Sequence, residues 1–181
     1  MDKKVCPYYL SGGLDNRIRR FFQNPQKILS SYIKEGMAVL DIGCGPGFFT
    51  LDMAILAGLE GVTIAADLQE EMLNKIRKKI KGTELENRIV FHKCMENRIG
   101  LNEKVDFALA FYMVHEVPDR LTFLGEVKEI LKPEGAFLIV EPPFHVSKRE
   151  FSSMIGDAIS LGYRIGKSPK MFPDKTLLLM K

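Results

Sequence analysis

The chain has 181 residues, 46% of them hydrophobic and 27% charged, a composition typical of a globular protein with one full core. No apolar run approaches the roughly 20 residues needed to cross a bilayer, and the N-terminus lacks the apolar stretch of a secretory signal. Three cysteines, Cys6, Cys44 and Cys94, are odd in number and show no metal-ligand spacing. We therefore expect free thiols in the cytoplasm, no transmembrane segment and no metal.

The net charge of +3 is concentrated near the N-terminus. Residues 1–35 carry seven basic and three acidic side chains, whereas the remaining residues carry 19 basic and 20 acidic ones. This basic arm is compatible with a solvated surface, and also with a landing site for an acidic substrate, RNA or anionic lipid. We expect residues 1–35 to form a helical arm and residues 36–181 to form the main domain.

Two short helices are expected in the arm. Residues 14–22 favour one or two helical turns. Residues 24–36 favour a helix with Asn24 as N-cap and Pro25 at the first helical position. Both elements precede the repeating part of the chain. They would lie over the carboxyl ends of the strands as a lid on the active site, or else pad the sheet edge.

From residue 36 onward, short apolar runs alternate with helical patterns. Strands are expected over residues 37–43, 61–68, 88–94, 104–113, 136–142, 163–169 and 176–181. Helices are expected over residues 48–57, 69–82, 120–135 and 147–162. The last helix opens with the capping-box spacing of Ser147 and Glu150.

The order of these elements predicts the fold class. Strands that alternate with helices imply a parallel sheet covered on both faces. The last two strands have no helix between them, so they must pair antiparallel. The predicted fold is α/β and Rossmann-like: a doubly wound, seven-stranded, mostly parallel sheet with the last strand antiparallel, in a three-layer α/β/α sandwich.

An acidic residue precedes a cluster of glycines in the stretch VLDIGCGPGFFT. Ligands of open α/β sheets bind beyond the carboxyl ends of the strands, and Gly43, Gly45 and Gly47 place the first strand-to-helix turn here. A dinucleotide fingerprint needs a third glycine where Phe48 stands, and Asp41 would repel a pyrophosphate. A ligand with a cationic amine and no phosphate fits better, and S-adenosylmethionine (SAM) is such a ligand.

A second carboxylate, Asp67, ends the next strand in the stretch TIAADL, about 20 residues beyond the glycines. There it can accept hydrogen bonds from both hydroxyls of a ribose. Leu68 follows it and offers an apolar face to adenine. An aspartate after a strand is also a common helix cap, so Asp67 taken alone is compatible with either role.

Four segments, VLDIGCGPG, ADLQEEML, DFALAFYMVHEVPD and EILKPEGAFLIVEP, resemble the successive motifs of class I SAM-dependent methyltransferases. The likeness is closest to the small-molecule and quinone-type branch, over residues 36–142. It implies that Asp41 holds the methionine end of SAM through its amine, directly or through water. It also implies a set of residues around the methionine, the ribose diol and the adenine, namely Gly43, Cys44, Gly45, Asp67 and Leu68.

The loop after the third strand, HKCMENR, stands where that family recognises adenine, usually with an acidic residue followed by a small one. This chain departs from the pattern, because Cys94 occupies the acidic position and Met95 and Glu96 follow it. The resemblance implies a backbone contact from Met95 and a side-chain contact from Cys94 or Glu96. It also places Phe111, at the end of the fourth strand, beside the cofactor.

The methyl acceptor is expected at the rim of the same cleft. Methyl transfer from a sulfonium depends mainly on in-line positioning, and a base is needed only for weakly acidic nucleophiles. His115 and Glu116 follow the fourth strand, and Glu141 and His145 follow the fifth. In the functional interpretation His115 faces the acceptor as a base or orienting group. In the structural alternative His115 and Glu116 are simply the half-exposed start of a helix.

Other methyltransferase chemistries lack their signatures in this sequence. Amino-directed nucleic-acid enzymes carry an Asn/Asp-Pro-Pro-aromatic run after the fourth strand, where this chain reads AFYM, and cytosine-C5 enzymes need a Pro-Cys pair. The main interpretation is a methyltransferase that uses SAM, releases S-adenosylhomocysteine (SAH) and acts on a small molecule; a homodimer is compatible with it. The alternative is a cofactor-binding module that acts on or with RNA or protein through the basic arm.

Overall fold

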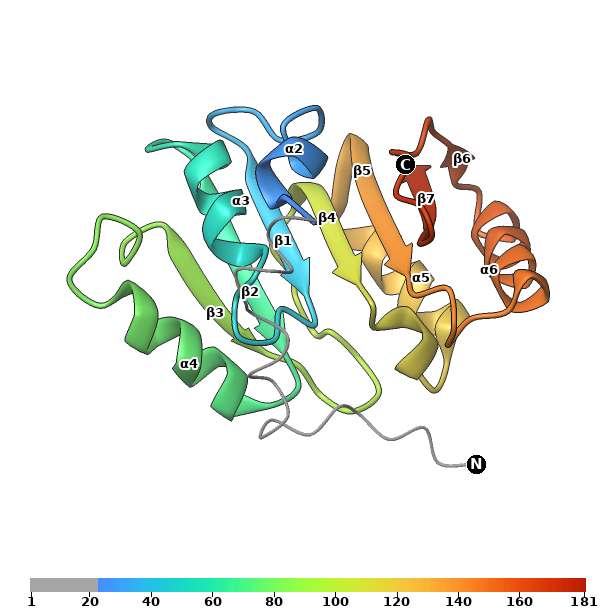
Figure 1. Cartoon of the computed structure of the whole chain (residues 1–181), viewed down its shortest axis with the longest axis horizontal. Coiled ribbons are helices and arrows are strands. Elements are labelled where there is room, and N and C mark those ends of the chain that lie inside the picture. Colours follow the sequence, from blue (N-terminus) through green and yellow to red (C-terminus); the bar gives the residue numbers. More distant parts are fainter. Residues whose placement is uncertain (1–22) are drawn as a thin grey trace.

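The computed structural model describes residues 23–181, so the helix expected over residues 14–22 lies outside the described range. Within that range, seven strands form one sheet in the order β3-β2-β1-β4-β5-β7-β6 (Figure 1). The strands are β1 (Ala38–Ile42), β2 (Val62–Asp67), β3 (Ile89–Lys93), β4 (Val105–Phe111), β5 (Leu131–Glu141), β6 (Arg164–Ile165) and β7 (Lys175–Met180). Strands β1 to β5 pair in parallel, and β7 runs antiparallel to both β5 and β6. The predicted fold class is confirmed.

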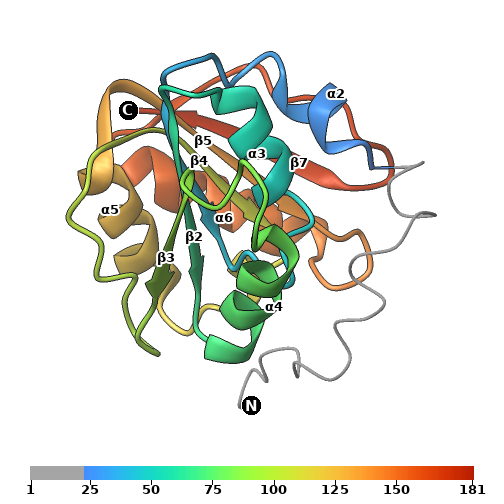
Figure 2. The same ribbon diagram turned by 90° about the vertical axis from the view of Figure 1, so that its left-hand side faces the viewer.

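Helices cover both faces of this sheet (Figures 1 and 2). One face carries α2 (Pro25–Leu29), α3 (Thr50–Ala57) and α4 (Glu70–Ile80). The other face carries α5 (Arg120–Ile130) and α6 (Lys148–Ser160). Strand side chains alternate between the two faces, as period-2 geometry requires, so that in β1 Val39 packs toward α2 and α3 while Leu40 packs toward α5.

The helix expected over residues 120–135 is shorter than predicted, because α5 ends at Ile130 and β5 begins at Leu131. Leu131 is fully buried and pairs with Val105, so the sheet draws this residue out of the helix. The pairing of β4 with β5 is irregular here, and Glu134 turns the chain with a φ of 62°. Tertiary pairing has overridden the local helix pattern.

Two further elements are shorter than the sequence suggested. The strand expected over residues 163–169 reduces to β6, which has two residues. The helix expected over residues 24–36 reduces to the five residues of α2, although its predicted N-cap is confirmed, since the Asn24 side chain accepts a hydrogen bond from the Lys27 amide over 3.1 Å.

The part of the N-terminal arm that the structure describes packs into the core. Leu29 and Ile33 are buried in the same cluster as residues of β1, β4 and α3. Tyr32 stacks on Phe107 of β4 with 5.8 Å between ring centroids. Residues 24–36 therefore cover a sheet face next to α3. The predicted lid over the active site depends on residues 1–22, which lie outside the described range, and it stays a prediction.

Candidate functional site

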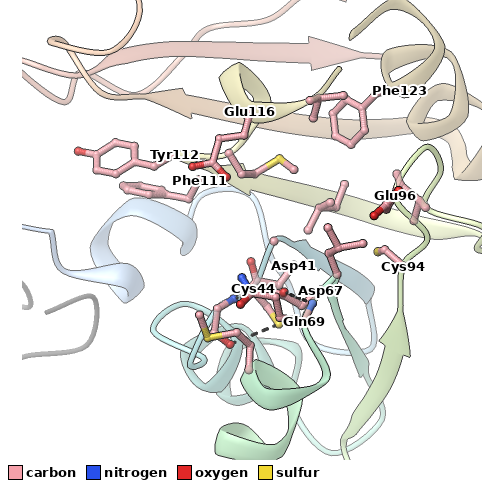
Figure 3. A pocket seen from close by; sticks show the side chains of 18 of the residues that line it. Asp41, Cys44, Asp67, Gln69, Cys94, Glu96, Phe111, Tyr112, Glu116 and Phe123 are labelled. Carbon is pink, nitrogen blue, oxygen red and sulfur yellow. Dashed lines mark hydrogen bonds between the residues drawn. The ribbon is translucent and has the colours of Figure 1, made fainter. Parts of the chain in front are cut away.

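A cavity of about 250 Å³ opens at the carboxyl ends of β1, β2 and β4, where they meet the loops that follow β3 and β4. Its lining includes all ten residues that the sequence placed around a cofactor: Asp41, Gly43, Cys44, Gly45, Asp67, Leu68, Cys94, Met95, Glu96 and Phe111. Figure 3 shows three groups around this space: Asp41, Cys44 and Asp67 on one side, Phe111, Tyr112 and Glu116 on another, and Cys94 with Glu96 on a third.

The amides of the glycine turn after β1 donate hydrogen bonds to other groups of the protein. The N–H groups of Gly43 and Cys44 both donate to the carbonyl of Ala66, over 2.8 and 3.1 Å. The amide of Gly45 donates to the Asp67 carboxylate over 2.9 Å, and the amide of Gly47 donates to the Cys44 carbonyl over 3.1 Å. A phosphate-binding turn points its amides at the ligand instead. This turn therefore offers no row of free donors to an anion.

Close packing explains why glycine occupies two positions of this turn. Gly43 has a φ of +66°, and an added Cβ would lie 3.0 Å from the Met113 side chain. Gly47 has a φ of +89°, and an added Cβ would lie 2.8 Å from Ile76 of α4. The turn is thus wedged between α4 and the segment after β4, which fixes its shape before any ligand arrives.

Asp41 lies at the end of β1 with 2% of its surface exposed. The hydroxyl of Thr50, the first residue of α3, donates to its Oδ2 over 2.6 Å. This hydrogen bond spans the glycine turn and orients the carboxylate toward the cavity, whose lining includes Asp41. The arrangement leaves a buried carboxylate in the cavity wall at the position where the sequence predicts a contact with an ammonium group.

Asp67 ends β2 and is 7% exposed. Its carboxylate accepts hydrogen bonds from Gly45 over 2.9 Å, from Gln69 over 2.8 Å and from Leu68. Burial raises the pKa of Asp67 above its ordinary value, and these three amides oppose the rise. Gln69, rather than Asp67, occupies the N-cap position of α4. Asp67 therefore joins β2, the glycine turn and the start of α4 at one wall of the cavity.

Both cysteines of the cavity have a raised pKa. Burial, helped by the nearby carboxylates of Asp67 and Glu126, raises the pKa of Cys94 to about 12. Burial raises the pKa of Cys44 well above its usual range, with added contributions from Asp41 and Asp67. Both thiols are free. They offer the cavity polarisable, uncharged surface rather than nucleophiles.

Two side chains hydrogen-bond to the loop that follows β3, and the sequence analysis predicted neither contact. Glu126 of α5 accepts hydrogen bonds from the amides of Ile99 and Gly100, over 2.8 and 3.2 Å. The Nε2 atom of His92 lies 2.7 Å from the carbonyl oxygen of Ile99. Glu126 also lines the cavity. These bonds fix the loop that carries Cys94, Met95 and Glu96, the segment expected to contact adenine.

Aromatic side chains build the wall on the β4 side. The rings of Phe49 and Phe111 lie 4.3 Å apart between centroids, and those of Phe111 and Tyr112 lie 4.4 Å apart. Tyr112 has a φ of 60°, a backbone conformation that costs a residue with a side chain of order 1 kcal/mol. Its hydroxyl donates to Asp174 over 2.7 Å and accepts from Gln23 over 2.6 Å, which holds the strained residue in place.

His115 and Glu116 share the 3-10 helix η2 (Val114–Glu116) but point in different directions. The Nδ1 atom of His115 lies 2.5 Å from Oε2 of Glu141, at the end of β5, and His115 does not belong to the cavity lining. Glu116 does line the cavity (Figure 3). Successive residues of a 3-10 helix project about 120° apart, so a histidine that turns to β5 leaves its neighbour facing the opening.

A comparison with protein families identifies the chain. A family model described as a methyltransferase domain matches residues 33–161, which is most of the chain. The chain belongs to this methyltransferase-domain family. The matched region contains the glycine turn, Asp41, Asp67 and η2, and it ends at the close of α6.

Several known proteins resemble this methyltransferase-domain chain. It is 29% identical over 145 residues to a demethylmenaquinone methyltransferase of Lactobacillus johnsonii, covering 76% of this chain and 57% of that protein. It is 31% identical over 144 residues to a demethylmenaquinone methyltransferase of Lactococcus lactis, covering 76% and 56%. The chain thus spans about half the length of the curated relatives it matches. A crystal structure of a SAM-dependent methyltransferase from Aquifex aeolicus superposes with a TM-score of 0.85 at 29% identity, over 97% of this chain and 99% of that one.

Within residues 23–181, no group of three or more histidine, cysteine, aspartate or glutamate side chains is arranged to hold a metal ion. No helix in this range is long and apolar enough to cross a membrane.

Proposed function

We propose that this methyltransferase-domain chain is a SAM-dependent methyltransferase that transfers a methyl group to a small-molecule acceptor and releases SAH. One observation carries the proposal: the amides of the glycine turn are consumed by Ala66, Asp67 and Cys44, while two buried carboxylates line the cavity beside them. That arrangement repels phosphate and suits a ligand with an ammonium group and free hydroxyls. The family membership and the Aquifex aeolicus structure support the same function.

In this proposal, different residues of the cavity contact different parts of SAM. When bound, SAM supplies an activated methyl group on its sulfonium. Asp67 accepts hydrogen bonds from the ribose hydroxyls with the oxygen lone pairs that Gly45 and Gln69 leave free. Asp41 attracts the ammonium group, directly or through water. The loop of Cys94, Met95 and Glu96 encloses the adenine.

The acceptor lies on the side of Phe111, Tyr112 and Glu116 in this proposal. These side chains form an aromatic wall with one carboxylate, which suits an apolar or planar small molecule. The relatives from Lactobacillus johnsonii and Lactococcus lactis are named demethylmenaquinone methyltransferases, so a demethylated quinol is the first acceptor to assay. The cytoplasmic location expected from the free thiols is part of the same proposal.

Calorimetric titration tests the cofactor first, because the chain contains no tryptophan for a fluorescence assay. We expect SAM and SAH to bind and NAD to give no heat. Transfer of a labelled methyl group from SAM to demethylmenaquinol then tests the acceptor. Binding of NAD in place of SAM and SAH would overturn the proposed cofactor, whereas SAM binding without transfer to any small molecule would remove only the acceptor class.

The alternative of an RNA- or protein-directed module rests on the basic arm, most of which lies outside the described residues. It predicts a salt-dependent association with RNA that is lost when residues 1–23 are deleted. Retention of full activity on a small molecule by the same truncated chain would count against it.

A further inference from the structure

Two phenylalanine side chains stand almost fully in solvent at one edge of the domain. Phe144 is 93% exposed and Phe172 is 100% exposed, and the next most exposed large hydrophobic side chain in the described range, Leu59, reaches 73%. Phe144 lies in the loop between β5 and α6, and Phe172 lies in the loop between β6 and β7. A single exposed apolar side chain is common, but large apolar side chains that gather on one surface mark an interaction site.

The antiparallel pairing of β5 with β7 brings these two loops together. The last residue pair between the two strands is Glu141 and Lys175, so the β5–α6 loop and the β6–β7 loop meet the sheet at the same end of these strands. The ammonium group of Lys175 donates to the carbonyl of Pro143 over 3.2 Å. Pro143 and Pro173, each next to one exposed phenylalanine, line one surface cleft together with the start of α6. The two aromatic side chains thus flank a common surface, the Phe144–Phe172 face.

Positive charge surrounds this face. Its two loops, the first turn of α6 and the first residue of β7 carry five basic side chains, namely Lys148, Arg149, Lys167, Lys170 and Lys175. Two acidic side chains, Glu150 and Asp174, lie in the same segments and accept hydrogen bonds from neutral donors, so five cations and two carboxylates leave a net charge of +3. Four of the five cations, all except Lys175, are exposed. The face therefore presents aromatic side chains within a field of positive charge.

We propose that the Phe144–Phe172 face docks on the surface of an anionic lipid bilayer. Aromatic side chains on loops insert at the boundary between headgroups and acyl chains, and each nearby lysine or arginine adds attraction to anionic headgroups. A second copy of this chain is a poorer occupant, because a two-fold contact would set the same cations against one another. The proposal does not depend on the reaction. Docking would orient the cavity, since Asp174 behind this face is bonded to the cavity residue Tyr112.

Tryptophan substitution gives a direct test, because the chain has no tryptophan of its own. In Phe144→Trp and Phe172→Trp we expect the emission to shift to shorter wavelength on adding vesicles of phosphatidylcholine with phosphatidylglycerol, but not with phosphatidylcholine alone. Leu59→Trp is the matched control, since Leu59 is exposed at the opposite edge, just before β2. No shift in the two phenylalanine positions, or an equal shift in all three, would overturn the proposal.

Vesicle sedimentation tests the contributions of the aromatic and the basic side chains separately. We expect Phe144→Ser with Phe172→Ser to abolish binding, and Lys167→Gln and Lys170→Gln each to weaken it about fivefold at low salt. Lys81→Gln, at an exposed lysine after α4, should leave binding unchanged. These side chains are exposed, so circular dichroism should report an unaltered fold. If the wild-type chain instead dimerises in solution without lipid and the double serine variant is monomeric, the face is a contact between copies and the lipid proposal fails.

Discussion

His115 and Glu141 are joined by two hydrogen-bond contacts at the carboxyl end of β5. The ring Nδ1 of His115 lies 2.5 Å from Oε2 of Glu141, and the main-chain amide of His115 donates to Oε1 over 3.1 Å. The Glu141 side chain is fully buried, whereas that of His115 is 19% exposed. Both carboxylate oxygens are thus bonded to one residue of η2, and the pair ties η2 to the end of β5. The ring of His145 lies edge-on to that of His115, with 5.6 Å between centroids.

His115→Ala should destabilise the domain by about 3 kcal/mol, because it removes the side chain that faces a fully buried carboxylate. Urea unfolding of the single variants and of His115→Ala with Glu141→Gln gives the coupling energy between the two residues. We expect the double variant to lose much less than the sum of the single losses. Unchanged stability together with lost turnover would instead support the role first predicted for His115, a group that acts on the acceptor.

Glu116→Gln should lower kcat/KM for the acceptor about 100-fold and leave the affinity for SAH unchanged. The reason is that Glu116, unlike its neighbour, lines the cavity on the acceptor side and can take a proton from a weakly acidic nucleophile. Steady-state kinetics and calorimetry on the same preparation measure the two quantities. Glu71→Gln, at an exposed acid of α4, is the control. Equal kinetics in both variants would show that transfer needs positioning alone.

The local pattern of apolar and capping residues predicted most of the fold. Apolar runs such as residues 37–43 predict strands because a strand of a two-sided sheet buries every side chain, and the capping box of Ser147 and Glu150 is formed as the spacing suggests. The end of α5 was missed because Leu131 gains more from pairing with Val105 than from another helical turn.

Ten of the residues that line the cavity were predicted by the motifs at the ends of β1 to β4, although they lie far apart along the chain. The hydrogen-bond partners that hold these segments in place were not predictable, because they come from distant positions. The clamp of Glu126 on Gly100 spans 26 residues, and the bond from Tyr112 to Asp174 spans 62. The direction of His115 depends on a carboxylate 26 residues away. Neither hydropathy nor motif spacing encodes such contacts.

Asp67→Asn should remove a pH dependence from both stability and binding. The folded-state pKa of Asp67 is raised above its ordinary 3.8, so its contribution to stability is full below that value and is lost as the pH rises through the raised pKa. Wild-type stability should therefore fall relative to that of Asp67→Asn over this window, measured by urea unfolding at a series of pH values. The ionised form accepts the ribose hydroxyls, so wild-type affinity for SAH should weaken as the pH falls through the same window.

At neutral pH we expect Asp67→Asn to weaken the free energy of SAH binding by about 1–3 kcal/mol, because one charged acceptor becomes a neutral amide. Calorimetry measures this loss directly. Equal affinity in the variant and the wild type would reduce Asp67 to a residue that only shapes the turn between β2 and α4.

Cys44 and Cys94 should resist alkylation in the native protein. At pH 8 a thiol with a pKa of about 12 is a thiolate in about one molecule in 10⁴, and the thiolate is the nucleophile. We expect iodoacetamide to modify the two corresponding peptides at least about 100-fold more slowly in buffer than in urea, as followed by mass spectrometry. Rapid native labelling of Cys94 would mean that the loop after β3 opens often enough to expose it.

Glu126→Gln should weaken SAH binding about tenfold without unfolding the domain. The carboxylate accepts two amide hydrogen bonds from the loop after β3, and a bond to a charged acceptor contributes about 1.5–3 kcal/mol. The glutamine side chain of the variant keeps one acceptor oxygen, so only one of the two amides loses its partner. Hydrogen exchange should rise at Ile99 and Gly100 while β4 and α5 stay protected. Glu129→Gln, at an exposed acid on the same helix, should change neither affinity nor exchange. If affinity falls equally in both variants, the cause is lost negative charge on α5 rather than a loosened loop; if exchange rises while affinity holds, the loop does not contact the cofactor.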